Sequence, residues 1–541
     1  MDIAAELARF NPDPALAEWV TAQLAEQAKV AQQAQHHADE VAQQHRLLQA
    51  KDRELHLKDQ ELRNKDLKIQ ALTLELAHHK RIRFGVKSEA LAPEQRDLFD
   101  DTCAEDGAAI IADVEQLQAP AERPQRKPTG RQPLPASLPR IEHRHEPATC
   151  TCGQCGQNLV PIGEDISEQL DVIPSQFIVH RHIRPQYACR HCETITAEPV
   201  PPAIIDGSQA APGLLAWVVI QKYLDHLPLY RIEQISARQG CGIARSTLAD
   251  WVGRVGVALQ PLADRLAVRL KQQTVLHADE TPVQQLDPGA GKTKRAYLWA
   301  YRSNDLSGGP PMVVFDYQTS RSGSHARAFL QGWQGTLMAD GYGGYKALFG
   351  QGVTELGCWA HARRKFFDLH AASNKPHEMA AVALQRIGEL YAIEAQAREQ
   401  SPAERQMLRQ TQSLPRLQAL HAWLIQQRQQ TTKTSGYGRA LDYSIHRWEA
   451  LSRYAQTGDL PIDNNAAESA IRPIALGRKN WLFTGSERAG HRAAAIQSLL
   501  ATAKLNGLEP LAWLTTTLER LPTWPNSRID ELLPLNSTTA S

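Results

Sequence analysis

The chain of 541 residues has little net charge and no long apolar run. Its 60 Lys and Arg residues nearly balance 59 Asp and Glu residues, so overall charge does not indicate nucleic-acid binding, which would need local basic clusters. The longest apolar run, about 214–220, is far shorter than the roughly 20 residues of a membrane-spanning helix. Asp2 and Glu6 precede any apolar stretch, which argues against a secretory signal. We therefore expect a soluble, cytoplasmic protein with several domains.

Cysteine is scarce, and five of the eight cysteines fall between Cys150 and Cys192. The pairs Cys152/Cys155 and Cys189/Cys192 are C-x-x-C motifs separated by alternating, strand-like sequence. In a cytosolic chain such clustering favours a metal over disulfides, and four thiolates from two tight turns suit one structural Zn²⁺ ion. Cys150 could replace Cys152 as a ligand. Four buried free cysteines or a redox pair are the alternatives.

Proline is absent between Pro14 and Pro93, and residues 15 to about 90 contain a single glycine, Gly85. Apolar residues recur there at every seventh position, which places them on one seam of a helix: Val41, Leu48, Leu55, Leu62, Ile69 and Leu76. The second seam position is mostly polar until Leu72. The pattern is half of a zipper, so we favour a dimeric coiled coil over the alternative of a solvated single helix.

Residues 118–148 combine prolines with six Arg or Lys residues. Proline removes backbone donors and prevents a packed fold, so this segment is expected to be an extended basic linker. It could lie along DNA phosphates or in a minor groove, or act only as a solvated spacer.

Residues 210–260 predict three helices, at 213–225, 229–238 and 246 to about 257, with a glycine turn at 240–242. Helix, turn and helix is typical of a helix-turn-helix DNA reader. With Ser246 as N-cap, Arg245, Thr247 and Asp250 would face outward at the start of the third helix. A helical hairpin that binds nothing is the alternative.

From Thr274 onward, short β-runs replace the helical pattern. We expect strands at 274–278, 297–301, 312–315, 336–339 and 353–358, and helices at 324–331 and around His361, which together predict a mixed α/β sheet flanked by helices. Asp279 and Asp340 each follow a strand, so both would lie at one edge of this sheet.

A third carboxylate, Glu468, lies in the Asn- and Arg-rich segment 463–473. Asn464 or Asn465 could cap a short helix there that Pro473 ends. Carboxylates that converge repel one another unless a cation joins them, and Mg²⁺ or Mn²⁺ prefers such oxygen ligands. Two such ions can support phosphoryl transfer. Around and after this segment come basic and aromatic residues that would form an electropositive surface: Arg472, Arg478, Lys479, Arg488 and Arg492, with Trp481 and Phe483. A surface helix with ordinary ion pairs is the alternative.

The motifs together resemble those of the insertion sequence 66 family of transposases, almost from end to end. The similar features are the leucine repeat, the basic linker, the C-x-x-C pairs and the segments 226–231, 277–281, 339–342, 358–364 and 463–483. The extra Cys150 departs from the simpler zinc pattern. The resemblance implies an RNase H-like domain with a DDE triad of Asp279, Asp340 and Glu468. Asp463 is the main rival to Glu468, whereas Glu280 would point to the opposite face of its strand and is excluded.

The reaction implied by this resemblance uses water to free a 3′-hydroxyl at each transposon end, and that hydroxyl then attacks target DNA. Expected partners are transposon ends, target DNA, a second copy of the chain in a homodimer or larger oligomer, and small accessory proteins of the same element, in the nucleoid of a bacterial cell. Candidate DNA contacts are Arg245, Thr247, Arg363, Arg364, Arg472, Arg478 and Lys479. His361, Arg363 and Arg364 are candidate contacts to DNA or to the transition state, and a His361 that is buried and satisfied by the core is the alternative. A DNA-binding regulator without catalysis and a metal-dependent nuclease that does not join are the alternative functions.

We expect a multidomain α+β protein. Its regions are a helical, coiled-coil N-terminal region at 1–117, the linker at 118–148, a zinc-binding domain at 149–200, a helix-turn-helix region at 206–262, an RNase H-like catalytic domain at 270–492 with a helical insertion at about 366–458, and a C-terminal helical region and tail at 493–541.

Overall fold

The computed structural model describes scattered positions between 18 and 69, residues 134–146 except 135 and 137, and residues 154–173, 176–287, 290, 292–371 and 378–536. The described positions up to 69 belong to one compact unit, and those from 134 onward belong to a second. Most of the expected basic linker and two expected zinc ligands, Cys152 and its rival Cys150, lie outside the described residues.

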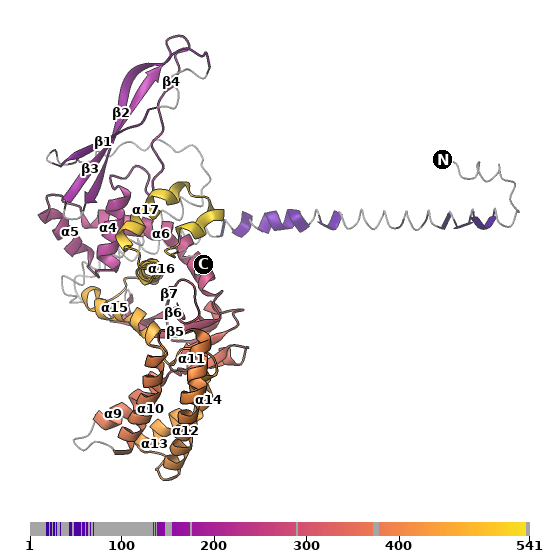
Figure 1. Ribbon diagram of the computed structural model, residues 1–541. Helices are drawn as coiled ribbons and strands as arrows, with labels where there is room; N and C mark the ends of the chain where they lie inside the picture. Colours follow the sequence, from indigo (N-terminus) through magenta and orange to yellow (C-terminus); the bar gives the residue numbers. More distant parts are fainter. Residues whose placement is uncertain are drawn as a thin grey trace. The chain divides into compact units, whose positions relative to one another are not determined.

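The N-terminal unit is helical at every described position (Figure 1). Leu48, Leu55, Leu62 and Ile69 of the apolar seam are 57–61% exposed. The ion pairs Glu54–Lys58 and Glu61–Lys65, each with a spacing of four residues and a distance of 2.6 Å, also stabilise a helix. A helix with an exposed apolar seam is the form that a coiled coil requires, and pairing itself stays a prediction.

The cysteine-rich region contains a small sheet. Its strands have the order β1-β3-β2, with β4 paired to β3: β1 (Arg140–Arg144), β2 (Val160–Ile173), β3 (Gln176–Ala188) and β4 (Ile195–Thr196). β2 and β3 form a long antiparallel hairpin, and β1 runs parallel to β3. Leu170, near the end of β2, and Phe177 and Val179, near the start of β3, pack into the same core as the helices that follow.

Three helices follow: α4 (Pro212–Tyr223), α5 (Leu229–Arg238) and α6 (Arg245–Leu270). Two expectations about α6 are wrong. It extends to Leu270 instead of ending near 257, because buried leucines continue at a helical spacing past Pro261. Its N-cap is Ala244 instead of Ser246, and the Arg245 amide donates to Glu233 Oε1 of α5 at 3.0 Å.

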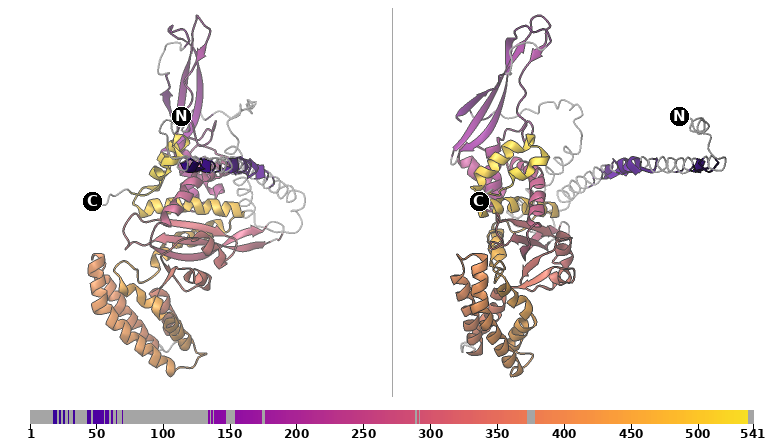
Figure 2. Two further views of the ribbon diagram at one scale, coloured as in Figure 1. Left: turned by 90° about the vertical axis from the view of Figure 1, so that its right-hand side faces the viewer. Right: turned by 45° about the vertical axis from the view of Figure 1, so that its right-hand side comes forward.

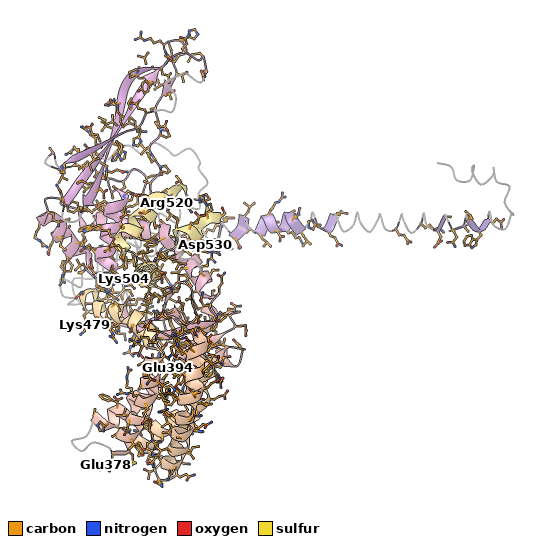
Figure 3. The ribbon with its side chains drawn as sticks, in the orientation of Figure 1. Glu378, Glu394, Lys479, Lys504, Arg520 and Asp530 are labelled. Carbon is orange, nitrogen blue, oxygen red and sulfur yellow. The ribbon has the colours of Figure 1, made fainter. Side chains whose placement is uncertain are left out.

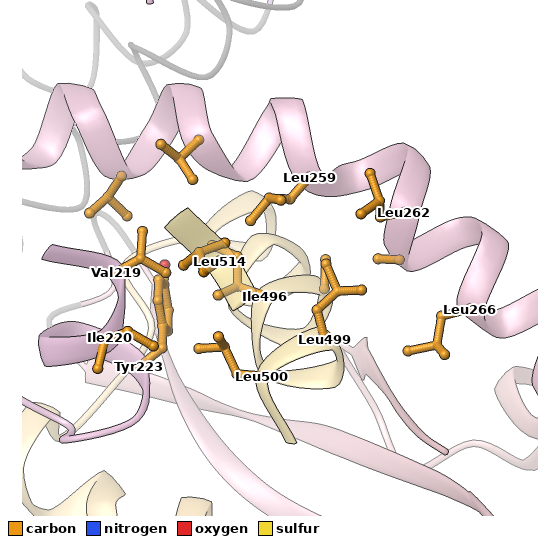
Figure 4. Close-up of a cluster of buried hydrophobic side chains, with 14 of the residues drawn as sticks. Val219, Ile220, Tyr223, Leu259, Leu262, Leu266, Ile496, Leu499, Leu500 and Leu514 are labelled. Atoms are coloured by element: carbon orange, nitrogen blue, oxygen red, sulfur yellow. The ribbon is translucent and has the colours of Figure 1, made fainter. Parts of the chain in front are cut away.

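α6 packs on α16 (Glu487–Leu505) through the central core of the protein (Figure 4). Leu259, Leu262 and Leu266 of α6 face Ile496 and Leu499 of α16. Leu514 of α17 (Pro510–Arg520) and side chains of α4 complete this cluster. The C-terminal segment is fixed to α6 by Asp530, which binds Arg265 and Arg269 and is labelled in Figure 3. Short 3-10 turns precede and include Asp530: Leu521–Thr523 and Asn526–Leu532.

The expected mixed sheet is confirmed. Its order is β7-β6-β5-β8-β9: β5 (Val275–Asp287), β6 (Lys292–Ser303), β7 (Val313–Gln318), β8 (Thr336–Ala339) and β9 (Thr354–Gly357). β5, β6 and β7 are antiparallel, whereas β8 and β9 are parallel to β5. Short helices connect these strands: α7 (Gly323–Phe329), η1 (Gly343–Tyr345) and α8 (Lys346–Phe349). The first strand does not end before Asp279 as expected, because its pairing with β6 continues to Asp287.

In the sequence, a bundle of helices, shown in orange in Figure 2, separates β9 from α15 (Asn465–Trp481). It consists of α9 (Trp359–Ala371), α10 (Glu378–Gln396), α11 (Pro402–Leu408), a π-helical turn (Arg409–Ser413), α12 (Leu414–Gln429), α13 (Gly436–His446), α14 (Trp448–Ser452) and a 3-10 turn (Arg453–Gln456). Arg409 of the π-helical turn is fully buried and binds Glu394 of α10 at 2.6 Å. Glu394 is labelled in Figure 3.

α15 also differs from the expected short helix, because it continues through Pro473 to Trp481. Ile471 and Ile474 on either side of the proline are buried against the sheet, and this packing holds the helix together despite the lost backbone hydrogen bond. Every helix in the described part of the chain is too short or too polar to cross a lipid bilayer.

Candidate active site and cysteine cluster

Asp279 lies on β5, and Asp340 directly follows the adjacent parallel strand β8. Val275, Leu276 and His277 of β5 pair with Thr336, Leu337 and Met338 of β8. Asp279 and Asp340 therefore occupy equivalent positions, each two residues beyond the last paired residue of its segment. Burial is the largest of the effects that raise the pKa of Asp279 to about 7. The carboxylates of Glu280, Asp340 and Glu468 act in the same direction, and a hydrogen bond from the Glu280 amide acts against them. The negative charges of both other candidate carboxylates, Asp340 and Glu468, therefore act on the pKa of Asp279.

Asn464 attaches the start of α15 to β5. Its side chain is fully buried; Oδ1 accepts from His277 Nδ1 at 3.0 Å, and Nδ2 donates to the carbonyl oxygen of Ala278 at 2.9 Å. Its backbone amide donates to Cys358 Sγ at 3.2 Å. These contacts place the first turn of α15 directly beside the strand residue that precedes Asp279.

Glu468 lies in that first turn of α15. Its Oε1 is 3.6 Å from His361 Nδ1, and its Oε2 is 3.6 Å from Arg364 Nη2, both on α9. Oε1 is buried and accepts no hydrogen bond from the described residues. Burial lowers the pKa of His361, while Asp340 and Glu468 act in the opposite direction. A carboxylate oxygen that binds a cation would, in the metal-free protein, be a buried oxygen without a hydrogen-bond donor, as Glu468 Oε1 is.

Asp279, Asp340 and Glu468 are close enough for their charges to interact, but their oxygens do not converge to within metal-binding distance of one another. Among the described residues, only the cysteine cluster has three potential ligand atoms within 4.8 Å of one another. The aspartates are held by local contacts: Asp279 Oδ1 accepts from the Glu280 amide at 2.9 Å, and Asp340 Oδ1 accepts from the Tyr342 amide at 2.8 Å. Tyr443 also donates to the carbonyl of Asp340 at 2.6 Å. Carboxylate oxygens of this kind fit Mg²⁺ or Mn²⁺.

The neighbouring acids have other partners. Glu280 is almost fully buried and binds Arg321 Nη2 at 2.5 Å and the Tyr345 hydroxyl at 2.9 Å. Asp463 accepts from the Asn465 amide at 3.1 Å and from its side chain at 2.9 Å. Each of these carboxylates thus already accepts hydrogen bonds from other groups of the protein.

The candidate DNA contacts divide into exposed and structural residues. Arg472 and Lys479 are exposed on α15, where Figure 3 labels Lys479. Arg478 is half-buried and donates to the carbonyl of Pro282, which attaches α15 to β5. Arg245 and Thr247 are half-buried at the start of α6. The position of each residue in the fold is thus known, whereas contact with DNA stays a prediction.

Two members of the expected electropositive surface lie in the core instead. Arg492 is buried, and a Cβ at Gly256 of α6 would lie 2.4 Å from its side chain. Phe483 is also buried. Close packing of α16 on α6 explains why Arg492 is directed inward, a contact that local charge patterns do not reveal.

Cys155, Cys189 and Cys192 meet at the end of the β2–β3 hairpin. Cys155 Sγ lies 3.3 Å from Cys189 Sγ and 3.8 Å from Cys192 Sγ. Hydrogen bonds from the Cys192 and His191 amides and from Cys155 lower the pKa of Cys189. Three converging thiols, one with a favoured thiolate, fit a zinc site that a fourth ligand would complete.

Local sequence patterns do not reveal the roles of Asn464 and His277. Of the two expected caps, Asn464 and Asn465, Asn464 occupies the N-cap position of α15, yet its side chain makes no capping hydrogen bond. A detectable signal was His277 itself, a polar residue inside the apolar run 275–278. A buried polar side chain in a strand requires a partner, and here the partner is 187 positions away.

The chain is similar to known proteins over most of its length. Family models match it at residues 207–492 (Transposase IS66 family), 149–193 (zinc-finger binding domain of transposase IS66), 498–535 (IS66 C-terminal element) and 71–142 (Transposase C of IS166 homeodomain). The uncharacterized protein y4qI of Sinorhizobium fredii (strain NBRC 101917 / NGR234) is 37% identical over 87% of this chain and 89% of its own length. The uncharacterized protein y4jD of the same strain is 35% identical over 86% of this chain and 94% of its own length.

Proposed function

The chain belongs to the IS66 family of transposases, and from this premise we propose that it binds the ends of a mobile DNA element, cuts them and joins them to target DNA. Asp279, Asp340 and Glu468 would be the catalytic carboxylates. The observation that carries this proposal is the anchoring of α15 by Asn464, which holds the helix turn that contains Glu468 beside β5, the strand of Asp279.

The sheet supports an RNase H-like catalytic domain. Three antiparallel strands are extended by two parallel ones, with Asp279 on the central strand β5 and Asp340 after its parallel neighbour β8. The long helical bundle between β9 and α15 would be an insertion into this domain.

The three carboxylates would hold Mg²⁺ or Mn²⁺, which would polarise the scissile phosphate and stabilise the charge on the attacking and leaving oxygens. Arg364 lies beside Glu468 and would bind a phosphate close to the reacting one. Arg472 and Lys479 would hold the DNA backbone further along α15. Water would attack the end of the element, and the freed 3′-hydroxyl would attack target DNA. Both are in-line transfers for which positioning is the main requirement.

The other regions would recognise and hold DNA. Cys155, Cys189 and Cys192, with Cys152 or Cys150, would bind one structural Zn²⁺ ion. α4 to α6 would form the helix-turn-helix reader, with Arg245 and Thr247 at its contact end. The N-terminal helices would join two copies so that both ends are held together, with accessory proteins of the same element, in the bacterial cytoplasm and on the nucleoid.

The test is strand transfer with linear DNA that carries the sequences flanking the gene, in Mg²⁺ or Mn²⁺. Asp279→Ala, Asp340→Ala and Glu468→Gln should each lower cleavage by roughly 10²-fold or more, the scale for losing a group that stabilises transition-state charge. DNA binding should persist in all three variants. Asp463→Asn is the matched control, because it keeps the oxygen that accepts from the Asn465 amide, and it should remain active.

Three outcomes would contradict parts of this proposal. Full activity in any carboxylate variant would remove that residue from the triad. Nicking without joining would indicate a nuclease. Binding of the ends without any cutting would indicate a regulator.

A further inference from the structure

A pocket of about 490 Å³ lies next to the candidate active site. Residues of α9 and α10 and the first residue of α15, Asn465, line it. Glu468 is three residues further along α15, and Arg364, which lines the pocket, is 3.6 Å from Glu468. The pocket volume is within the range of roughly 300–1,000 Å³ that is usual for small-molecule sites.

The lining combines cations with aromatic rings. Arg363 and Arg364 provide two guanidinium groups, and Phe367 and Tyr391 provide rings from α9 and α10. Phe367 is 47% exposed, and the Arg363 guanidinium lies 5.8 Å from the centre of its ring. Guanidinium groups bind phosphate, whereas an accessible ring face binds a flat, unstacked base.

We propose that this pocket binds a nucleotide that is unstacked from the DNA next to the cleaved phosphate. Phe367 and Tyr391 contact the base, and Arg364 binds the adjoining phosphate. A track for phosphates alone would need the arginines but not an exposed ring in a pocket. A paired, stacked base cannot enter a pocket, so the strand must separate locally, which costs a few kcal/mol that stacking on the rings offsets.

This proposal rests on the proposed function only for the presence of DNA beside Glu468, and it can be tested without chemistry. The probes are fluorescein-labelled octamers: oligo(dT), and an oligomer of eight abasic sites with the same phosphates. Their dissociation constants are measured with the full chain by fluorescence anisotropy, in buffer without added Mg²⁺ or Mn²⁺.

The wild-type chain should bind oligo(dT) at least about fivefold more tightly than the abasic oligomer, the lower end of what stacking one base contributes. Phe367→Ala and Phe367→Leu should remove this preference, whereas Phe367→Trp should keep it. Arg364→Ala should weaken both probes by the same factor. Leu414→Ala, at a comparably exposed residue of α12, should change neither.

Equal binding of the two probes by the wild-type chain would overturn the proposal. So would a preference that survives in Phe367→Leu, or a loss of affinity for both probes in that variant. Since no cleavage is measured, a preference that depends on Phe367 stands even where the strand-transfer test fails.

Discussion

At the scale of single residues, Asn464 decides where Glu468 lies. Its amide oxygen accepts from His277, and its amide nitrogen donates to the Ala278 carbonyl. No other side chain of this size combines an acceptor and a donor in this way. Burial lowers the pKa of His277, which keeps the ring neutral with its Nδ1 proton directed at Asn464.

Replacing Asn464 should separate activity from binding. Asn464→Ala leaves the buried His277 Nδ1 without its acceptor, which should cost about 1–3 kcal/mol of stability. It should also slow cleavage more than it weakens DNA binding, because Glu468 loses its fixed position relative to Asp279. Thermal unfolding, DNA binding and the Mn²⁺ concentration at half-maximal cleavage measure these effects.

Asn480→Ala is the matched control, since Asn480 is an exposed asparagine of the same helix. It should change none of the three measurements. A normal cleavage rate and Mn²⁺ dependence in Asn464→Ala would show that Asn464 has no positioning role.

At the scale of elements, a row of histidines joins β1 to β3. His143 Nε2 lies 2.8 Å from His180 Nδ1, and His145 Nε2 lies 2.9 Å from His182 Nδ1. His180 Nε2 is 2.6 Å from Asp171 of β2. Burial lowers the pKa of His182 to about 4, helped by the three other histidines and by Arg184.

The small sheet should therefore lose stability in mild acid. The unfolded chain takes up a proton at His182 near pH 6.5, whereas the folded chain resists until about pH 4, so stability falls as the pH falls through this window. The shift in pKa corresponds to about 3 kcal/mol between pH 7 and pH 4, and partial exposure of His182 to solvent should reduce this loss to about 2 kcal/mol. Unfolding between pH 7 and pH 4, followed by hydrogen exchange at β1 and β3, measures it.

His182→Gln should flatten this pH dependence, because glutamine takes up no proton in this range. His191→Gln is the control: His191 lies in the same region outside the histidine row, and its substitution should leave the dependence unchanged. A wild-type profile in His182→Gln would assign the acid sensitivity to other groups.

At the scale of the whole molecule, the N-terminal seam is the feature that should set the oligomeric state. Leu55 and Leu62 are exposed along one line of the helix, and burying such leucines against a second copy stabilises a dimer. Leu55→Lys with Leu62→Lys should convert the dimer to a monomer in analytical ultracentrifugation.

Leu57→Lys is the matched control, because Leu57 is a leucine with 65% exposure that lies off the seam. It should leave the dimer intact. A double seam variant that remains dimeric would place the interface elsewhere.

The amino-acid sequence alone determined those features that depend on local periodicity and spacing. The alternating sequence between the C-x-x-C pairs predicted strands there, and short β-runs predicted the strands of the mixed sheet. The spacing of Cys189 and Cys192 predicted a tight turn with two thiols. Asp279, Asp340 and Glu468 could be proposed because several motifs of this chain occur in the same order as in a known family, which implies these three acids as its triad.

Only the tertiary structure decided which distant residues meet. The hydrogen bonds between Asn464 and β5, the burial of Arg492 against α6, and the continuation of α15 through Pro473 all depend on contacts between segments far apart in the sequence. Local patterns cannot show such contacts, because burial and hydrogen bonding are satisfied across the fold and not along the chain.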